Sequence, residues 1–103
     1  MAATHDLDST IQTCRLLSDP TRVRLLAVLG VSALSVAELT EATRLPQPRV
    51  STHLRKLREA GLVEASRIAG QSRYRLPAAG WPANQKAVVE AVLASTEDPL
   101  IEE

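Results

Sequence analysis

Polar and basic side chains follow one another closely over residues 47–56. Amide, guanidinium and hydroxyl groups are the groups that read donors and acceptors on base edges in a DNA groove, whereas lysine and arginine also hold phosphate. We expect one group of these side chains to approach base edges and another, basic group to bind phosphate. The first group consists of Gln47, Arg49, Ser51 and Thr52, with Pro48 beside them, and the second of Arg55 and Lys56.

A third group of polar side chains lies further along the chain, at a predicted turn. Its side chains are long or hydrogen-bonding, and they flank a glycine, Gly70. Such side chains on a hairpin can reach a neighbouring minor groove or the DNA backbone. The residues are Arg67, Gln71, Ser72 and Arg73.

The charge of the chain is unevenly distributed. The 103 residues have a formal net charge of zero, yet residues 44–75 hold eight basic residues against two acidic ones. Both flanking segments are acidic. A solvated basic face is the simple alternative, but here the bases are interleaved with a pattern of helices and a hairpin, which favours nucleic acid binding.

The polar side chains of 47–56 lie on a predicted helix with an apolar stripe, whose first turn holds Gln47 and Arg49. Val50, Leu54 and Leu57 lie within about 60° of one another on a helical wheel, and Thr52 and Arg55 lie opposite them. This helix is predicted to begin near Gln47 and to end at Gly61. His53 lies at the edge of the apolar stripe, where we expect it to pack or hydrogen-bond.

Two shorter helices are predicted before it, each with a capping signal. Asp19-Pro20 is an N-cap followed by proline at the first helical position, which predicts a helix over 21–29. Ser35 and Glu38 match a capping box, which predicts a helix from there to about Thr43. The helix pair over about 35–60 is a helix-turn-helix, in which the second helix enters the groove.

A β-hairpin is predicted over about 62–76, with a turn at 69–72 and its arginines on one face. The fold class is therefore mainly α with a small β-hairpin wing: a winged helix-turn-helix of about five helices, in the order α-α-α-α-β-β-α. We expect residues 1–103 to form one domain.

The first and last helices, predicted over about 8–17 and 84–95, have apolar faces that a chain of this size has too small a core to bury alone. A homodimer would bury them. We expect Cys14 to play a buried apolar role in line with its neighbours, with redox sensing as the alternative. The expected dimer interface consists of Leu7, Ile11, Cys14, Val88, Val89, Val92 and Leu93.

Several classes of protein are disfavoured. No apolar run reaches the length of about 20 residues that spans a bilayer, and the N-terminus lacks the pattern of a signal peptide, so a cytoplasmic protein without membrane contact is expected. The single cysteine excludes an internal disulfide. Neither a phosphate-binding glycine loop nor a nucleophile with a base at helical or loop spacing is found, which argues against an enzyme.

Four segments, in this order, resemble the ArsR/SmtB family of winged-helix repressors: DPTRVRLL at 19–26, LSVAEL at 34–39, QPRVSTHLRKL at 47–57 and AGLV at 60–63. The resemblance covers nearly the whole chain. It implies a homodimer joined by the first and last helices, which binds a two-fold, palindromic operator on double-stranded DNA and often releases it when an effector binds.

The metal sites of many family members have no counterpart here. Where those members have two cysteines in the third helix, this chain has Ser35 and Ala37, and its last helix offers Glu90 but no histidine. We therefore expect no metal, no cofactor and an effector of another kind. Some relatives are fused to a methyltransferase, and we expect no such domain here. The alternative function is a winged-helix module for protein interaction or dimerisation without DNA binding.

Overall fold

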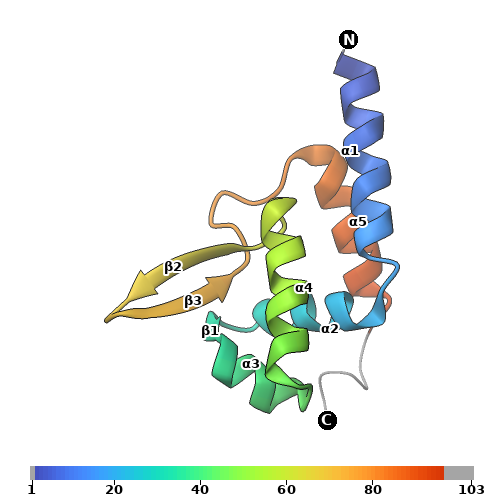
Figure 1. The fold of residues 1–103 in the computed structure, drawn as a ribbon. Helices are drawn as coiled ribbons and strands as arrows, with labels where there is room; N and C mark the ends of the chain where they lie inside the picture. Colours follow the sequence, from blue (N-terminus) through green and yellow to red (C-terminus); the bar gives the residue numbers. More distant parts are fainter. Residues whose placement is uncertain (1, 97–103) are drawn as a thin grey trace.

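The structure, a computed structural model, describes the backbone of residues 2–96 and the side chains from Leu7 to Thr96. Five helices surround the core in this part of the chain, and a β-hairpin projects from one side (Figure 1). The predicted domain ends at residues 1 and 103, which lie outside the described residues. The elements are α1 (Ala2–Leu16), α2 (Pro20–Leu29), β1 (Leu34–Ser35), α3 (Val36–Thr43), α4 (Gln47–Glu59), β2 (Glu64–Ile68), β3 (Gln71–Arg75) and α5 (Ala83–Ala94).

The predicted fold class, a winged helix-turn-helix that is mainly helical, is confirmed, with differences in the first helix, in an additional strand and in the hairpin turn. Helix α1 begins at Ala2, earlier than the predicted Asp8. The second difference is strand β1, which the sequence analysis did not predict. It pairs with β3 and gives a three-stranded sheet in the order β1-β3-β2. Two residues are too few to show the alternation by which a strand is recognised in a sequence.

Two predicted capping motifs are present and position the helix-turn-helix. The carboxylate of Asp19 accepts a hydrogen bond from the backbone N–H of Thr21 at 2.8 Å, at the start of α2. At the start of α3, Ser35 Oγ accepts from the N–H of Glu38, and Glu38 Oε1 accepts from the N–H of Ser35. These reciprocal bonds satisfy two of the amide groups that a helix leaves without partners at its first turn.

Helix α4 ends where Gly61 was predicted to stop it. The N–H of Gly61 donates to the carbonyl of Arg58, and the N–H of Leu62 donates to the carbonyl of Leu57, both at 2.9 Å. This pair of hydrogen bonds forms a Schellman motif. The motif needs one residue in the left-handed backbone conformation, and here that residue is Gly61, with a φ of +79°. Leu57 and Leu62 are both completely buried, so the turn is also closed by apolar contact.

The core lies between α2, α3, α4 and α5. Its largest members are aliphatic, because the chain has no phenylalanine. The predicted apolar stripe of α4 is confirmed, since Val50, Leu54 and Leu57 are all completely buried. They pack in one cluster with Leu25, Leu26, Leu39, Leu62 and Val89.

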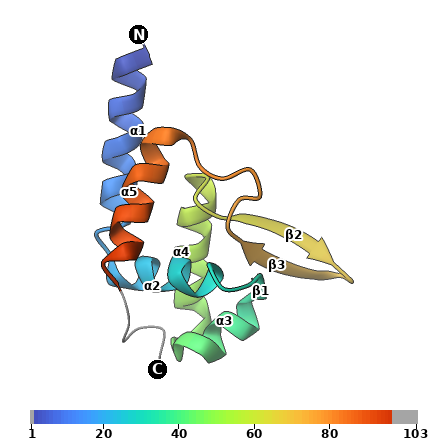
Figure 2. The ribbon, with the colours of Figure 1, turned by 180° about the vertical axis from the view of Figure 1, so that it is seen from behind.

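Helices α1 and α5 lie side by side (Figure 2) and are joined by polar contacts as well as packing. Gln85 Nε2 on α5 donates to Thr13 Oγ1 on α1 and to the carbonyl of Ala60, each at 3.2 Å. Thr13 Oγ1 in turn donates to the carbonyl of Ser9. Because Thr13 and Gln85 are buried, these bonds avoid the cost of unpaired polar groups, and they tie both helices to the end of α4.

The hairpin turn is tighter than predicted. It consists of Ala69 and Gly70 alone, and Gln71 and Ser72 belong to strand β3. Both turn residues have positive φ, 54° and 76°, as in the type I′ turns that match the twist of a hairpin. An alanine in this conformation is strained, whereas asparagine or glycine adopts it readily.

Replacing Ala69 with Asn should therefore stabilise the protein. The expected gain in the free energy of unfolding is about 1 kcal/mol, because asparagine tolerates the left-handed conformation and Asn-Gly favours this turn. Urea denaturation followed by circular dichroism measures it. Ala69→Val is the opposite control, since a β-branched side chain disfavours positive φ. A stability order of Val above Asn would contradict this account of the turn.

No helix among the described residues is both long and apolar enough to cross a lipid bilayer.

Candidate nucleic-acid interface

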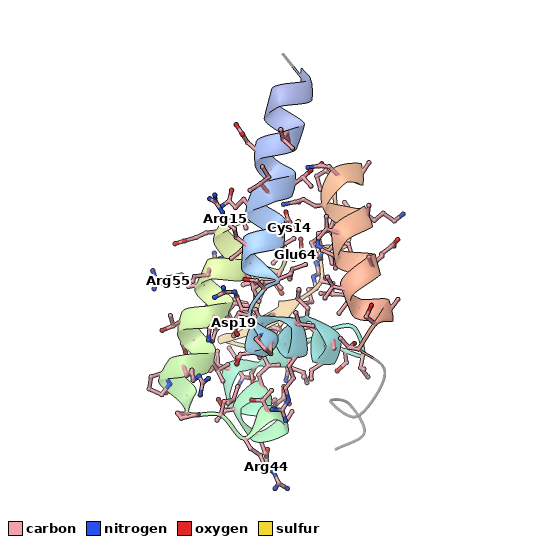
Figure 3. The ribbon with its side chains drawn as sticks, turned by 90° about the vertical axis from the view of Figure 1, so that its right-hand side faces the viewer. Cys14, Arg15, Asp19, Arg44, Arg55 and Glu64 are labelled. Carbon is pink, nitrogen blue, oxygen red and sulfur yellow. The ribbon has the colours of Figure 1, made fainter. Side chains whose placement is uncertain are left out.

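The face of α4 opposite its buried stripe is open to solvent. Gln47, Pro48, Arg49, Thr52, Arg55 and Lys56 are exposed, and Ser51 is half-buried. In Figure 3 the side chain of Arg55 points away from α1 and α5, into open space. The structure thus leaves the predicted base-reading and phosphate-binding side chains of this helix open to solvent, apart from the half-buried Ser51.

Some of these polar groups already have partners within the helix. Gln47 Nε2 donates to Ser51 Oγ at 3.3 Å, and Thr52 Oγ1 donates to the carbonyl of Pro48 at 2.9 Å. Arg49 has no hydrogen bond or ion pair with any side chain that the structure describes. Its guanidinium is therefore available to a ligand, and the amide of Gln47 is held over the first turn.

The hairpin divides its arginines between two faces, contrary to the prediction that one face carries them. Cross-strand pairs in the same pleat share a face. Arg67 pairs with Ser72, and Ala65 with Tyr74, on one face, while Ser66 pairs with Arg73 and Glu64 with Arg75 on the other. Arg73 and Arg75 pair with Ser66 and Glu64 on β2. Arg67 is one and three residues from these partners, and because side chains alternate along a strand, it lies on the other face.

The two arginines of the second face are neutralised by carboxylates. Arg73 Nη1 lies 3.0 Å from Glu38 Oε1 on α3, and Arg75 Nε lies 2.8 Å from Glu64 Oε2 on β2. Arg67, on the other face, instead donates from Nη2 to the carbonyl of Gly70 in the turn. In the described part of the chain, Arg67 is the only one of these three arginines that has no carboxylate beside it.

A groove of about 450 Å³ lies between α4 and the wing, lined by Arg55, Arg58, Glu59 and Tyr74. The sequence analysis did not assign a role to Arg58 or Tyr74. A signal was present for Arg58, which lies three residues after Arg55 and hence on a neighbouring position of the same helical face. Tyr74 joins the groove only through the strand register, which sets it on the same face of the hairpin as Arg67.

His53 lies at the edge of the core, as expected, and it contacts the beginning of α2. Its Nδ1 is 3.2 Å from Arg22 Nη1, and Arg22 Nε donates to the carbonyl of Leu16 at 2.7 Å. Arg22 also lies 3.9 Å from Asp19. One guanidinium therefore connects the end of α1, the N-cap of α2 and the middle of α4.

Burial and neighbouring charges shift the pKa values of His53 and Asp19. Burial lowers the pKa of His53 below its ordinary value; Asp19 opposes this shift, and Arg22, Arg49 and Lys56 add to it. Burial would raise the pKa of Asp19, but the Thr21 N–H and the charges of His53 and Arg22 hold it below its ordinary value. Neutral imidazole is also the form whose Nδ1 can accept a hydrogen bond from Arg22.

The apolar faces expected to form a dimer interface are only partly free. Leu7 is 58% exposed and Ile11 41% exposed, and Cys14, in line with them, is also exposed in the single chain. On α5, Val88, Val92 and Leu93 are half-buried against the core. Val89 is completely buried in that core, so it is not available to a partner, and its placement in the interface was wrong.

No group of three or more histidine, cysteine, aspartate or glutamate side chains is arranged to hold a metal ion in the described part of the chain.

Comparison with known proteins places this geometry among bacterial regulators. The family model described as "Bacterial regulatory protein, arsR family" matches residues 19–65. The transcriptional repressor SmtB of Mycobacterium tuberculosis is 39% identical over 70 residues, which cover 68% of this chain and 52% of that protein. The regulator KmtR of the same organism is 44% identical over 66 residues, covering 64% of this chain and 51% of that protein. The chain thus matches about half the length of these relatives.

The similarity to solved structures is more extensive. The transcriptional repressor BigR from Xylella fastidiosa is 30% identical, with a TM-score of 0.73, and the match covers 90% of this chain and 88% of that one.

The contact between His53 and Arg22 should make stability depend on pH. Because the pKa of His53 is lowered in the folded protein, the unfolded chain binds its proton more readily, so stability should fall as the pH drops below about 6.5. The urea midpoint at pH 7.5 and at pH 5.5 measures this loss. In His53→Gln the loss should be smaller, and an equal loss in both proteins would assign the pH dependence to other groups.

Proposed function

Because this chain belongs to the arsR family of bacterial regulatory proteins, we propose that it is a homodimeric, sequence-specific DNA-binding regulator of transcription, acting as a repressor. One observation carries the proposal: three completely buried side chains hold α4 so that its polar and basic face is open to solvent. That is the arrangement a recognition helix needs to enter the major groove.

Base reading is assigned to the first turns of α4. Arg49 supplies a guanidinium that suits the two acceptors of guanine, and Gln47 offers an amide held beside Ser51. Thr52 lies on the same exposed face. Arg55 and Lys56 lie further along the helix, where side chains meet phosphate rather than base edges, and Arg58 joins them.

The wing is assigned to the DNA backbone or to the minor groove. Arg67 at the tip has no carboxylate partner and shares a face with Ser72 and Tyr74. Gln71 lies on the opposite face, beside the tip, and is exposed. The groove between α4 and the wing, with Arg55 and Arg58 on its wall, suits the strand of phosphates that passes between a recognition helix and a wing.

Dimerisation is assigned to the exposed apolar stripe of α1, formed by Leu7, Ile11 and Cys14, together with the half-buried Val88, Val92 and Leu93 of α5. A two-fold dimer would place two copies of α4 about one helical turn of DNA apart, roughly 34 Å, and would require a palindromic operator.

The regulator proposal includes no metal effector of the usual family kind. Ser35 stands where many members have a metal-binding cysteine, and its hydroxyl is engaged in capping α3. Release of DNA would then depend on another signal.

Selection of bound duplexes from a random pool, followed by anisotropy titrations, tests DNA binding. We expect a palindromic site and an affinity that falls steeply with salt. Arg49→Ala should reduce the discrimination between this site and a scrambled duplex by about 1–3 kcal/mol. Lys56→Ala should weaken binding to both and reduce the salt slope by about 0.9.

Lys86→Ala, which removes a charge from α5, is the matched control and should leave binding unchanged. A wild-type protein without salt-dependent affinity for any duplex would overturn the regulator proposal and favour a protein-interaction module.

The dimer is tested by Ile11→Glu. A carboxylate in the middle of the apolar stripe would lose its hydration in a dimer, so the dissociation constant should rise at least roughly tenfold. Gln12→Glu adds the same charge to the neighbouring, exposed position and serves as the control. Sedimentation velocity at several concentrations measures both. Equal dissociation constants for the two variants would place the interface elsewhere.

A further inference from the structure

Arg73 lies in the wing but points at the helix-turn-helix. Its Nη1 donates to Glu38 Oε1 at 3.0 Å, and the carbonyl of Ala33 lies 3.5 Å from the same nitrogen. The backbone makes the same connection, because Arg73 on β3 pairs with Ser35 on β1, directly before α3. Side chain and backbone therefore join the wing to the first helix of the helix-turn-helix at one point.

The acceptor of this bond already has a structural task. Glu38 Oε1 accepts from the N–H of Ser35 at 2.9 Å, as part of the capping box of α3. That bond, with the charge of Arg73, lowers the pKa of Glu38 below its ordinary value. One carboxylate oxygen thus receives a donor from the start of α3 and another from the wing, so the two elements share a common point of attachment.

The other wing ion pair lacks this connection. Arg75 pairs with Glu64, its cross-strand partner in the same hairpin, at 2.8 Å. It joins β2 to β3 and leaves the orientation of the hairpin relative to α3 unaffected. The two pairs have similar exposure, since the side chains are 31% and 45% exposed in the first and 48% and 39% in the second. They differ chiefly in what they connect.

We propose that Arg73 is a positioning residue that holds the wing at a fixed orientation to α3 through Glu38, and that it does not bind phosphate. The inference extends the proposed function, because the orientation matters for DNA binding. With the hairpin held in this way, Arg67 and the groove of Arg55, Arg58 and Tyr74 lie on the face away from Glu38 and meet the DNA.

The decisive variant is Glu38→Gln. Glutamine also serves at the third position of a capping box, so the start of α3 is retained while the charge partner of Arg73 is lost. A positioning role predicts that DNA affinity falls, roughly three- to tenfold. A phosphate-binding Arg73 would instead be released from a competing carboxylate, so affinity would stay the same or rise, and this result would overturn the proposal.

Arg73→Gln gives a second, independent measurement. If Arg73 acts through Glu38, its loss should weaken binding by the same factor, leave the salt slope unchanged and add nothing to Glu38→Gln in the double variant. A slope reduced by about 0.9 would identify Arg73 as a phosphate ligand and overturn the proposal. Glu64→Gln is the matched control, because it removes the acid of the wing's own ion pair.

A measurement without DNA separates this inference from the proposed function. In free protein, Glu38→Gln and Arg73→Gln should accelerate amide hydrogen exchange in the β1–β3 pairing, at the partners Leu34 and Tyr74, whereas Glu64→Gln should not. Unchanged exchange in both variants would overturn the positioning role. If the wild-type protein bound no DNA, the regulator proposal would fail, and the exchange rates would still decide whether Arg73 holds the wing.

Discussion

The buried stripe of α4 is the constraint on which the other parts of the interface depend. Val50, Leu54 and Leu57 are completely excluded from water, and burying an aliphatic side chain of this size is worth about 1.5–3 kcal/mol. Rotating α4 about its axis would expose all three at once. The opposite face, with Arg49 and Arg55, is therefore presented to solvent by the packing, although neither arginine contributes to that packing. The Schellman turn after α4 then directs the chain into the hairpin.

Acidic side chains decide which basic residues remain available. The charge count of residues 44–75 would let every basic side chain there attract phosphate. In the structure, however, Glu38 lies 3.0 Å from Arg73 and Glu64 lies 2.8 Å from Arg75, so two wing arginines are paired with carboxylates. Neither pair is buried, so each contributes little to stability. These pairs instead orient the side chains. Arg73 faces α3, whereas Arg67, near the wing tip, has no carboxylate beside it among the described residues. The basic surface is consequently narrower than the basic sequence, and it runs along α4 and one face of the hairpin.

Helices α1 and α5 serve both the interior of the protomer and its outer surface. Their polar contacts, through Thr13 and Gln85, are internal and connect them to the end of α4. The apolar stripe of α1 faces outward, and Ile11 is 41% exposed. Arg22 makes a further connection to α4, because it joins the end of α1 to His53.

Local patterns in the sequence were sufficient for the helices, the caps and the buried stripe of α4, because capping and helical periodicity depend on residues within about four positions of one another. The family was recognisable for the same reason. The strand β1, the burial of Val89 and the division of the wing arginines were not predictable in this way. They depend on contacts between residues distant in the chain, such as Arg73 with Glu38. Strand register and the packing of helix on helix decide those contacts, and both are properties of the tertiary structure.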